Sequence, residues 1–273
     1  MPRTMLTLEL AIATYGDDGI VRASAMLLPE VEGIGYVISW QNGGGSVPAA
    51  IARRRDVRLV RLDGAGLSRN RNNALAHSTA DIVLPTDDDL IYSPDALNAV
   101  RRIFESRPDL DFLRFDCAAA GAAPHPTAAP ADFCGRFPKM ANPTSYELAV
   151  RRTTAGRVRF DERFGLKSGR YNAAEDDMYY HTLVRLGLRG RYEPLTVCRH
   201  PELSTGLRHI ADPLVIRAMG VYIGVRYPLS GPLRIPLKAW RDSRAGRAPF
   251  LAGLRELSRG YAESFFISRP WKR

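Results

Sequence analysis

The sequence predicts an α/β domain with a mostly parallel central sheet, followed by a helical C-terminal region. In the first half of the chain, short apolar runs alternate with stretches of helical periodicity, which is the pattern of a parallel sheet flanked by helices. Residues 211–273 instead combine helical periodicity with many basic side chains. Because 273 residues suffice for one large domain and a small appendage, we expect a main domain over 1–210 and a basic helical region over 211–273.

The expected strands are apolar runs that end at turn-forming or acidic residues. They cover residues 6–14, 36–40, 57–62, 82–86 and 112–115, with a last short strand at 195–198. Helices are expected at about 19–29, 46–55, 68–78 and 94–106. Residues 119–132, rich in Ala and Pro, should form a loop with His125 on its surface, and strand pairing should resume near 145–150. A further helix should begin at Glu175 and Asp176, because Tyr179, Leu183 and Leu186 share one helical face.

The composition excludes several classes of protein. The cysteines Cys117, Cys134 and Cys198 are odd in number and far apart, which indicates neither a disulfide framework nor a zinc site. No uncharged apolar stretch approaches the roughly 20 residues of a membrane-spanning helix, and the first residues lack the pattern of a signal peptide. We therefore expect a cytoplasmic protein.

Positive charge is concentrated near the C-terminus. Of the 39 Lys and Arg residues, 12 lie in residues 217–273, which hold only three of the 29 Asp and Glu residues. A net charge of +10 is compatible with a nucleic-acid-binding protein, because basic surfaces bind phosphate backbones. The rest of the chain is nearly neutral, however, and its conspicuous clusters are acidic. A site for a metal ion and a nucleotide is therefore the better interpretation, and we expect no nucleic-acid partner.

The most informative cluster is Asp87, Asp88 and Asp89, which follows the apolar run 82–86 directly. Like charges this close together need either a cation among them or full solvation. Carboxylate oxygens suit Mg²⁺ or Mn²⁺, which commonly bridges one or two carboxylates to substrate phosphates. Ligands of open α/β sheets also bind beyond the carboxyl ends of the strands. The position thus favours a divalent-cation site over a solvated acidic turn.

Further candidate residues lie at two expected helix starts and one strand end. Ser68 is a candidate N-cap, which places Arg71 in the first helical turn. A cation is favourable there only if an anion binds, and otherwise Arg71 is a solvated surface residue. Glu175 and Asp176 either stabilise a first helical turn or supply a general base. His200 is either a metal ligand or a structural residue.

In their order and spacing, these residues resemble the family 2 glycosyltransferases, which are inverting enzymes with the GT-A fold. The resemblance covers about residues 5–205 and rests on the segments 66–72, 80–89 and 175–176. Residues 160–165 and 200–205 are also similar to a bacterial subgroup that makes cell-surface polysaccharides.

The resemblance implies metal-dependent transfer of a sugar from a nucleotide-sugar donor to a glycan or lipid-linked acceptor. Asp176 would be the catalytic base, and Glu175 would orient it or contact the acceptor. A divalent cation (Mn²⁺ or Mg²⁺) would be held by Asp89, Asp87 and His200. The donor nucleotide would be bound by Thr14, Tyr15, Trp40, Asn42, Arg71, Asp87 and Asp88.

Two departures from the family pattern affect the expected donor site. Where the family usually has Asp-Asp-Gly-Ser after the second strand, residues 39–42 read Ser-Trp-Gln-Asn. Trp40 would then stack on the base and Asn42 would hydrogen-bond to it, and a uridine donor is not implied. Ala74 and Ala174 also stand where glycines are common. A catalytically silent, transferase-like subunit is the other interpretation of the same motifs.

The C-terminal region is expected to contact an anionic membrane at the inner face of the plasma membrane, where a lipid-linked acceptor would be presented. Basic residues gain roughly 1 kcal/mol each near an anionic leaflet, and an amphipathic helix adds buried apolar area. The same apolar stripe could instead cover the main domain or a partner subunit. The stripe lies on a helix that opens at Pro249 and consists of Phe250, Leu251, Leu254, Leu257, Tyr261 and Phe265.

Overall fold

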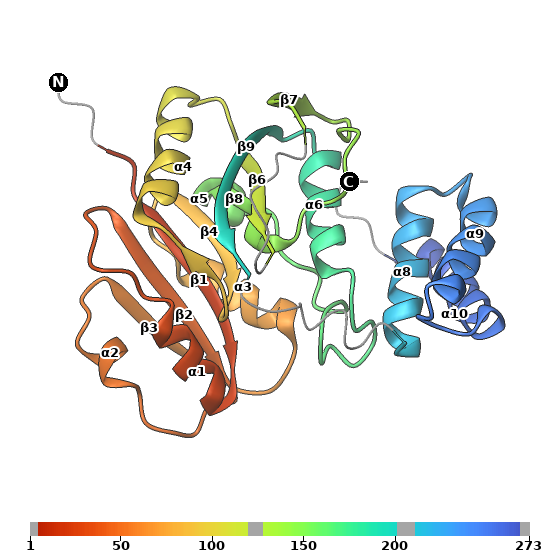
Figure 1. Cartoon of the computed structure of the whole chain (residues 1–273), viewed down its shortest axis with the longest axis horizontal. Helices are drawn as coiled ribbons and strands as arrows, with labels where there is room; N and C mark the ends of the chain where they lie inside the picture. Colours follow the sequence, from red (N-terminus) through yellow and green to blue (C-terminus); the bar gives the residue numbers. More distant parts are fainter. Residues whose placement is uncertain (1–4, 120–127, 201–210, 268–273) are drawn as a thin grey trace. The chain divides into compact units, whose positions relative to one another are not determined.

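A computed structural model of the chain describes residues 5–119, 128–200 and 211–267 (Figure 1). The chain divides into two compact units, and each is described by itself. The first unit comprises Met1–Ala65, Arg69–Arg159 and Leu183–Leu203. The second comprises Gly66–Ser68, Phe160–Thr182 and Ser204–Arg273. The second unit therefore combines the C-terminal helices with a segment near residue 170 that the expected boundary at 210 assigned to the main domain.

The first unit is built on one mixed sheet with the strand order β3-β2-β1-β4-β8-β6-β9-β5, and β7 pairs with β9. Neighbouring strands from β3 to β4 are parallel, as is the pair β6 and β9, whereas β8, β5 and β7 pair antiparallel to their neighbours. The strands are β1 (Leu8–Tyr15), β2 (Ile34–Gln41), β3 (Val57–Leu62), β4 (Ile82–Asp87), β5 (Ile91–Tyr92), β6 (Phe112–Ala118), β7 (Ala131–Cys134), β8 (Leu148–Arg151) and β9 (Arg189–Arg199).

Helices connect these strands in the alternation expected of an α/β fold. Helix α4 begins after Ser93, because the Ser93 side chain accepts a hydrogen bond from the Ala96 N–H and Pro94 occupies the first turn. The helices of this part of the chain are α1 (Gly16–Ala25), α2 (Ala49–Ala52), α3 (Leu67–His77), α4 (Pro94–Ser106), η1 (Ser145–Glu147), α5 (Arg152–Ala155) and α6 (Glu175–Arg185).

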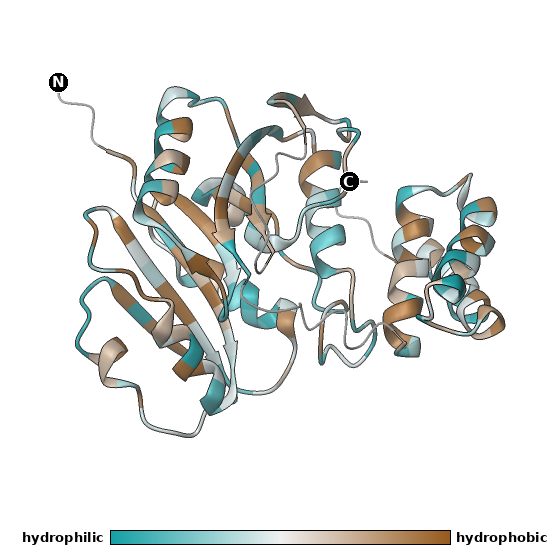
Figure 2. Cartoon of the chain, viewed as in Figure 1, coloured by the Kyte–Doolittle hydropathy of each residue, from teal (hydrophilic) through white to brown (hydrophobic). Residues whose placement is uncertain are grey.

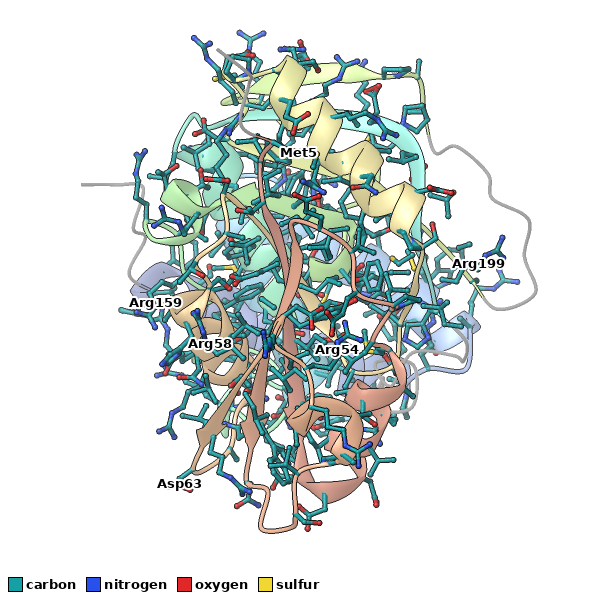
Figure 3. The ribbon with its side chains drawn as sticks, turned by 90° about the vertical axis from the view of Figure 1, so that its left-hand side faces the viewer. Met5, Arg54, Arg58, Asp63, Arg159 and Arg199 are labelled. Carbon is teal, nitrogen blue, oxygen red and sulfur yellow. The ribbon has the colours of Figure 1, made fainter. Side chains whose placement is uncertain are left out.

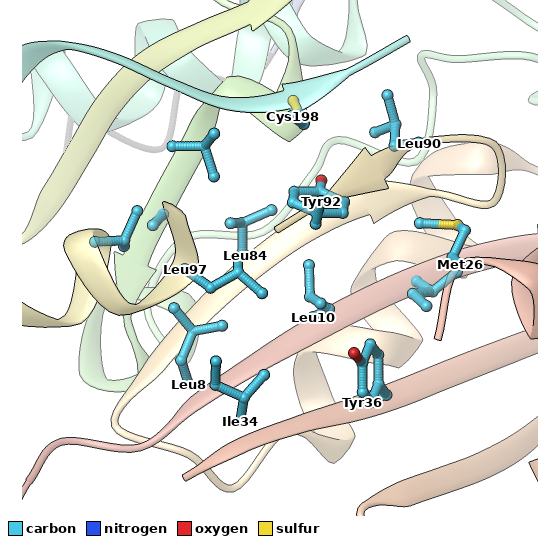
Figure 4. Close-up of a cluster of buried hydrophobic side chains, with 14 of the residues drawn as sticks. Leu8, Leu10, Met26, Ile34, Tyr36, Leu84, Leu90, Tyr92, Leu97 and Cys198 are labelled. Carbon is cyan, nitrogen blue, oxygen red and sulfur yellow. The ribbon is translucent and has the colours of Figure 1, made fainter. Parts of the chain in front are cut away.

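The core of the first unit lies where α1 and α4 cover one face of the sheet. Alternate residues of β1, among them Leu8 and Leu10, point into this core beside Leu84 of β4 and Leu97 of α4 (Figure 4). This alternation is the period of two that places every second strand residue on one face. At the edge strand β3 the pattern is more polar, and Arg58 and the following Asp63 are exposed (Figure 3).

The sequence predicts most of these elements within a few residues. The α/β fold is confirmed, and β3 and α4 have the expected bounds. The helix expected at 46–55 shrinks to the single turn of α2, and the last strand is longer than expected. The N-cap assignment of Ser68 is wrong, because α3 begins at Leu67 and the Ser68 hydroxyl donates to the carbonyl oxygen of Phe164 at 2.7 Å.

The second unit contains α8 (Pro213–Arg226), α9 (Gly231–Arg244), α10 (Phe250–Glu263) and η2 (Ser264–Phe266), as the basic helical region was expected to. One side of α8 packs with residues near the start of α6, such as Tyr171 and Met178, and another packs with α9 and α10. At the α8–α10 crossing the two backbones approach closely. A Cβ atom built on Gly260 would lie 2.0 Å from the carbonyl oxygen of Arg217, and one on Gly220 would lie 2.2 Å from that of Leu257.

This packing corrects the apolar stripe expected on α10. The buried face of the helix is formed by Gly253, Glu256, Leu257 and Gly260. Leu257 does lie in the core, but Leu251 at one end of the expected stripe is 77 % exposed. Glu256 is buried because Arg217 donates two hydrogen bonds to its carboxylate, at 2.6 and 2.9 Å. The sequence pattern did not predict this buried face, because glycines and a glutamate paired with arginine are not counted as apolar residues.

The glycine crossing gives a direct test of this packing. Gly260→Ala should lower the free energy of unfolding by about 1–3 kcal/mol, because the added methyl group forces α10 away from α8. The matched control is Gly253→Ala on the same helix, where the nearest atom, Ala239 Cβ, is 4.0 Å from the added group. There the better helix propensity of Ala should leave stability unchanged or raise it by up to about 1 kcal/mol. Urea unfolding measures both, and equal effects would contradict the close approach.

Candidate active site

The three aspartates lie where the sequence places them, at the carboxyl end of β4, and each has a different partner. Asp87 is the last residue of β4 and is 29 % exposed. The Arg71 guanidinium, which is only 2 % exposed, donates to Asp87 Oδ1 at 2.7 Å. The expectation that Arg71 contacts the nucleotide stays a prediction. Its charge is directed at Asp87, and it acts on the site by positioning that carboxylate.

Helix α3 carries further polar side chains that bind strand ends. The Asn70 side-chain amide donates to the carbonyl oxygen of Thr14 at the end of β1, at 2.8 Å. The Asn73 amide donates to the Ser39 hydroxyl on β2, also at 2.8 Å. Both acceptors lie near the carboxyl ends of the parallel strands β1 and β2. The Asn and Arg residues of this helix thus fix the edge of the sheet at which the aspartates lie.

Asp88 is buried and accepts hydrogen bonds from β1 and α1 of the first unit. Its Oδ2 atom accepts a hydrogen bond of 2.5 Å from the Thr14 hydroxyl and one of 3.0 Å from Arg22, and its Oδ1 atom accepts another from Arg22 at 3.1 Å. Burial raises the pKa of Asp88, and the bonds from Arg22 and Thr14 oppose that rise. Thr14 and Asp88 are both at most 8 % exposed. These two residues bind each other, and the expectation that they also bind the nucleotide stays a prediction.

Asp89 is brought beside His200 by the two-residue strand β5. Ile91 of β5 pairs antiparallel with Arg199 of β9, so the residues just before Ile91 lie next to those just after Arg199. The His200 Nε2 atom is 3.6 Å from Asp89 Oδ2. The other oxygen, Oδ1, is buried and, among the described residues, has no hydrogen-bond partner. Burial and the negative charge of Asp87 both raise the pKa of Asp89.

This carboxylate is chemically suited to a divalent cation. A buried oxygen without a donor is costly, and a cation would satisfy it. Within the described parts of the chain, no three His, Cys, Asp or Glu side chains are grouped to hold a metal ion by themselves. Asp89 and His200 would therefore supply only two ligands, and phosphate oxygens and water would have to supply the rest. That division is usual for Mg²⁺ in phosphate-binding sites.

The loop after β2 is held rigidly at the same end of the sheet. The Asp17 carboxylate accepts the N–H groups of Gly44 and Gly45, at 3.1 and 3.0 Å. Asn42 adopts a φ of 54°, and its amide donates to the Tyr15 hydroxyl at 3.0 Å. Both Asn42 and Tyr15 are exposed, so they remain candidates for contact with a ligand.

Trp40 does not have the role that the sequence suggested. Its side chain is fully buried, and the indole N–H donates to the Gly16 carbonyl oxygen at 2.7 Å. The Arg61 guanidinium covers the ring at 4.2 Å from its centroid, and the ring contacts the backbone of Gly43 so closely that a Cβ there would overlap it. Base stacking by Trp40 is thus corrected to support of the loop. Burial on both sides leaves no ring face for a base.

Glu175 and Asp176 begin α6, as expected, and belong to the second unit. The turn at Gly165, with a φ of 97°, lies against Glu175 and the Ser68 side chain, since an added Cβ would be 3.4 and 3.2 Å from them. The turn is also fixed by the Leu67 N–H, which donates to the Leu166 carbonyl oxygen at 3.0 Å. Two of the segments that carry the resemblance thus meet at this turn. The assignment of Asp176 as a base stays a prediction.

Ala174, just before α6, explains one departure from the family pattern. It has a φ of 66°, which is a left-handed conformation that glycine adopts without steric cost. The glycine common at this position is therefore a backbone requirement, and Ala174 meets it under strain. The segment that follows His200 and the surface position of His125 lie outside the described residues.

The comparisons with known proteins agree with this geometry. Residues 47–121 match the family model described as Glycosyl transferase family 2, a range that includes α3 and the three aspartates. In this range the chain is therefore similar to the family 2 glycosyltransferases. The match agrees with the family and the class of enzyme that the sequence motifs indicated. No curated protein sequence matches the chain.

Similar solved structures confirm the fold of this chain. The crystal structure of S. aureus TarS 1-349 has a TM-score of 0.60 and 13 % sequence identity, and the match covers 96 % of this chain and 92 % of that one. The same protein in complex with UDP-GlcNAc has a TM-score of 0.57 and 14 % identity, with 96 % and 76 % covered. At such low identity the likeness shows the GT-A type of fold.

Sequence reasoning missed Arg22 and Asp17. Both lie on α1, directly after the first strand, and both hold other parts of the site by hydrogen bonds. Asp17 carried a weak signal, since it belongs to the turn-like segment after β1. Arg22 carried none, because a single arginine on an amphipathic helix reads as a solvated residue.

The different partners of Asp88 and Asp89 predict different consequences of mutation. Asp88→Ala should lower the free energy of unfolding by about 2–4 kcal/mol, because it leaves Thr14 and Arg22 without their acceptor. Asp89→Ala should change stability by less than about 1 kcal/mol, or raise it, because a buried, unsatisfied carboxylate is removed. Thermal or urea unfolding without added metal compares the two. A larger loss for Asp89→Ala would contradict the assignment.

Proposed function

We propose that this protein is a metal-dependent, inverting glycosyltransferase that moves a sugar from a nucleotide-sugar donor to a hydroxyl of a glycan or lipid-linked acceptor. The observation that carries the proposal is the buried, unsatisfied Asp89 oxygen beside His200, at a strand end within the family 2 segment. The resemblance of residues 160–165 to the bacterial subgroup supports a role in surface polysaccharide synthesis.

The donor is proposed to bind at the carboxyl ends of β1, β2 and β4. The similar TarS structure in complex with UDP-GlcNAc supports a nucleotide sugar as the class of donor. In this chain Asn42 and Tyr15 offer exposed hydrogen-bonding groups from a loop that Asp17 holds in place. Asp87 is proposed to contact the ribose, in an orientation that Arg71 fixes. A preorganised set of polar groups lowers the cost of ordering the donor.

The chemistry requires stabilisation of the leaving nucleoside diphosphate. A divalent cation (Mn²⁺ or Mg²⁺), held by Asp89 and His200 with Asp87 nearby, would supply positive charge for the phosphate oxygens. Arg71 and Arg22 do not compete with Asp89 for that task, because they are already committed to Asp87 and Asp88. This division keeps the Asp89 carboxylate available while its two neighbours are neutralised.

Asp176 is proposed to take the proton of the attacking hydroxyl, and Glu175 is proposed to orient it or to contact the acceptor. The first turn of α6 lies at a helix N-terminus, which favours the ionised carboxylate that a base must be. Attack from the face opposite the leaving group would then invert the anomeric centre. This assignment rests on the family resemblance, and the positions within the second unit are compatible with it.

A lipid-linked acceptor would require the protein to work at a membrane surface, as a cytoplasmic protein attached to the inner face of the plasma membrane. Among the described residues, no helix has the length and apolar character to cross a membrane. Any attachment proposed for these helices is therefore peripheral, through side chains at their surface.

The proposed metal site is tested by Asp89→Asn, which keeps the shape of the side chain and removes its charge. Binding of UDP or GDP in the presence of Mn²⁺, measured by calorimetry, should weaken at least tenfold, and EDTA should have no further effect. The control Glu30→Gln removes an exposed carboxylate near the amino end of β2, away from the proposed donor site, and should leave binding unchanged. Undiminished, EDTA-sensitive binding by Asp89→Asn would refute this metal site.

The proposed base is tested by Asp176→Asn against Asp177→Asn. Both carboxylates lie in the first turn of α6 and stabilise it alike, so a purely structural role would make the two variants similar. If Asp176 is the base, Asp176→Asn alone should lose roughly 10²–10⁴-fold in turnover, and it should retain its affinity for the donor. Nucleotide-sugar turnover, measured with a panel of donors, decides between them. Absence of turnover in the wild-type protein with every donor would favour the silent-subunit interpretation.

A further inference from the structure

Helix α9 presents large apolar side chains to solvent, which is unusual for a helix already packed in a small unit. Leu233 is 78 % exposed, Leu237 45 % and Trp240 49 %, and Leu229 in the preceding turn is 95 % exposed. The spacing of Leu233, Leu237 and Trp240 places these three residues on one face of the helix, and Leu229 precedes that face by four residues. Exposed apolar groups that form one continuous face mark an interaction site rather than chance exposure.

The same helix uses another face for its own fold. Ile235 and Ala239 are buried together with Ile216 and Ile223 of α8 and Leu257 of α10. The outward leucines are therefore not needed to attach α9 to its unit. Brown and teal segments alternate along α9 and α10 in Figure 2, as expected for helices that carry both apolar and charged faces.

Arginines flank the outward apolar face. In the described parts of the chain, Arg234, Arg241 and Arg244 pair with no carboxylate, whereas Lys238 is bound to Asp242 at 2.8 Å. Arg244 lies over the Trp240 ring at 5.2 Å from its centroid, and Arg234 lies over the Tyr227 ring at 3.8 Å. Such stacking holds the charges at the border of the apolar face. Arg234 Nε donates to the Ser230 hydroxyl at 3.0 Å, and its terminal nitrogens remain for a headgroup.

We propose that α9 and the turn at Leu229 dock on an anionic lipid surface, with Leu229, Leu233, Leu237 and Trp240 entering the interface between headgroups and acyl chains. Leucines with a tryptophan suit that depth, because indole is favoured at the membrane–water boundary. The unpaired arginines match the negative charge of the headgroups. A purely apolar partner would leave these charges uncompensated, which favours a lipid surface over the apolar face of another protein.

Co-sedimentation of the whole protein with vesicles tests the surface. Phosphatidylcholine vesicles with about 30 % phosphatidylglycerol should bind the protein, and pure phosphatidylcholine should bind it at least tenfold more weakly. The double variant Leu233→Gln, Leu237→Gln should reduce binding at least tenfold. The double variant Arg241→Gln, Arg244→Gln should reduce it about fivefold per arginine on the anionic vesicles, and added salt should reduce wild-type binding in the same direction.

Matched controls separate this face from general hydrophobicity and general charge. Leu251→Gln alters an exposed leucine on α10 of the same unit, and it should change binding by less than about twofold. Arg53→Gln with Arg55→Gln removes two exposed arginines from the first unit, with the same change of net charge, and should also have little effect. Trp240 reports contact directly: its fluorescence should shift to shorter wavelength on anionic vesicles, and Trp240→Phe should abolish that shift while retaining binding.

Three outcomes would overturn the proposal: no binding to anionic vesicles, binding that the α9 variants leave unchanged, or vesicle-independent self-association that Leu233→Gln, Leu237→Gln abolishes. The last would assign the face to a second copy of this chain, and analytical ultracentrifugation detects it. Circular dichroism must show that each variant keeps the wild-type melting temperature. Vesicle binding requires neither donor nor turnover, so its result stands apart from the tests of the glycosyltransferase.

Discussion

The first unit depends on charge compensation among three consecutive carboxylates. Asp88 is buried next to two other acids, and burial of such a group is tolerated only with hydrogen bonds and opposite charge. Arg22 from α1 and Arg71 from α3 each neutralise one acid, and Thr14 of β1 completes the set. Elements far apart in the sequence are thereby joined at one strand end. The edge of the sheet that is proposed to bind the donor is therefore also one of the principal structural junctions of the unit.

The sequence was most informative where local periodicity coincides with local structure. It placed β4, α4 and the start of α6 correctly, and it identified the aspartates as a strand-end cluster. It could not tell whether an arginine near acids binds phosphate or carboxylate, so it did not predict the hydrogen bond from Arg71 to Asp87. It could not reveal β5 either, because two residues carry no period, and yet β5 is what brings His200 to Asp89. The sequence also could not reveal that the Trp40 ring is buried, because the ring is covered by Gly43 and Arg61, and these contacts form only in the folded chain.

The second unit shows how small residues and polar pairs can replace apolar patterning. Gly220 and Gly260 allow α8 and α10 to meet backbone to backbone, and Glu256 is buried at the same crossing with its arginines. A prediction that counts apolar residues misses such an interface, and it wrongly predicts burial for the exposed residues at the start of α10, such as Leu251. Conversely, the outward leucines of α9 were hidden by two prolines and four basic residues within fourteen positions. On α9, the outward apolar face is not the face that packs in the unit.

The unequal treatment of the three aspartates has a consequence for how ligands would bind. Two of the three negative charges are already neutralised by arginines, so Asp89 alone would attract a free divalent cation, and with His200 it would do so weakly. A diphosphate adds both charge and oxygen ligands. If the cation binds as proposed, cation and donor must therefore enter as a thermodynamically coupled pair. By linkage, each would raise the affinity of the other by the same factor, and neither would saturate the protein readily alone.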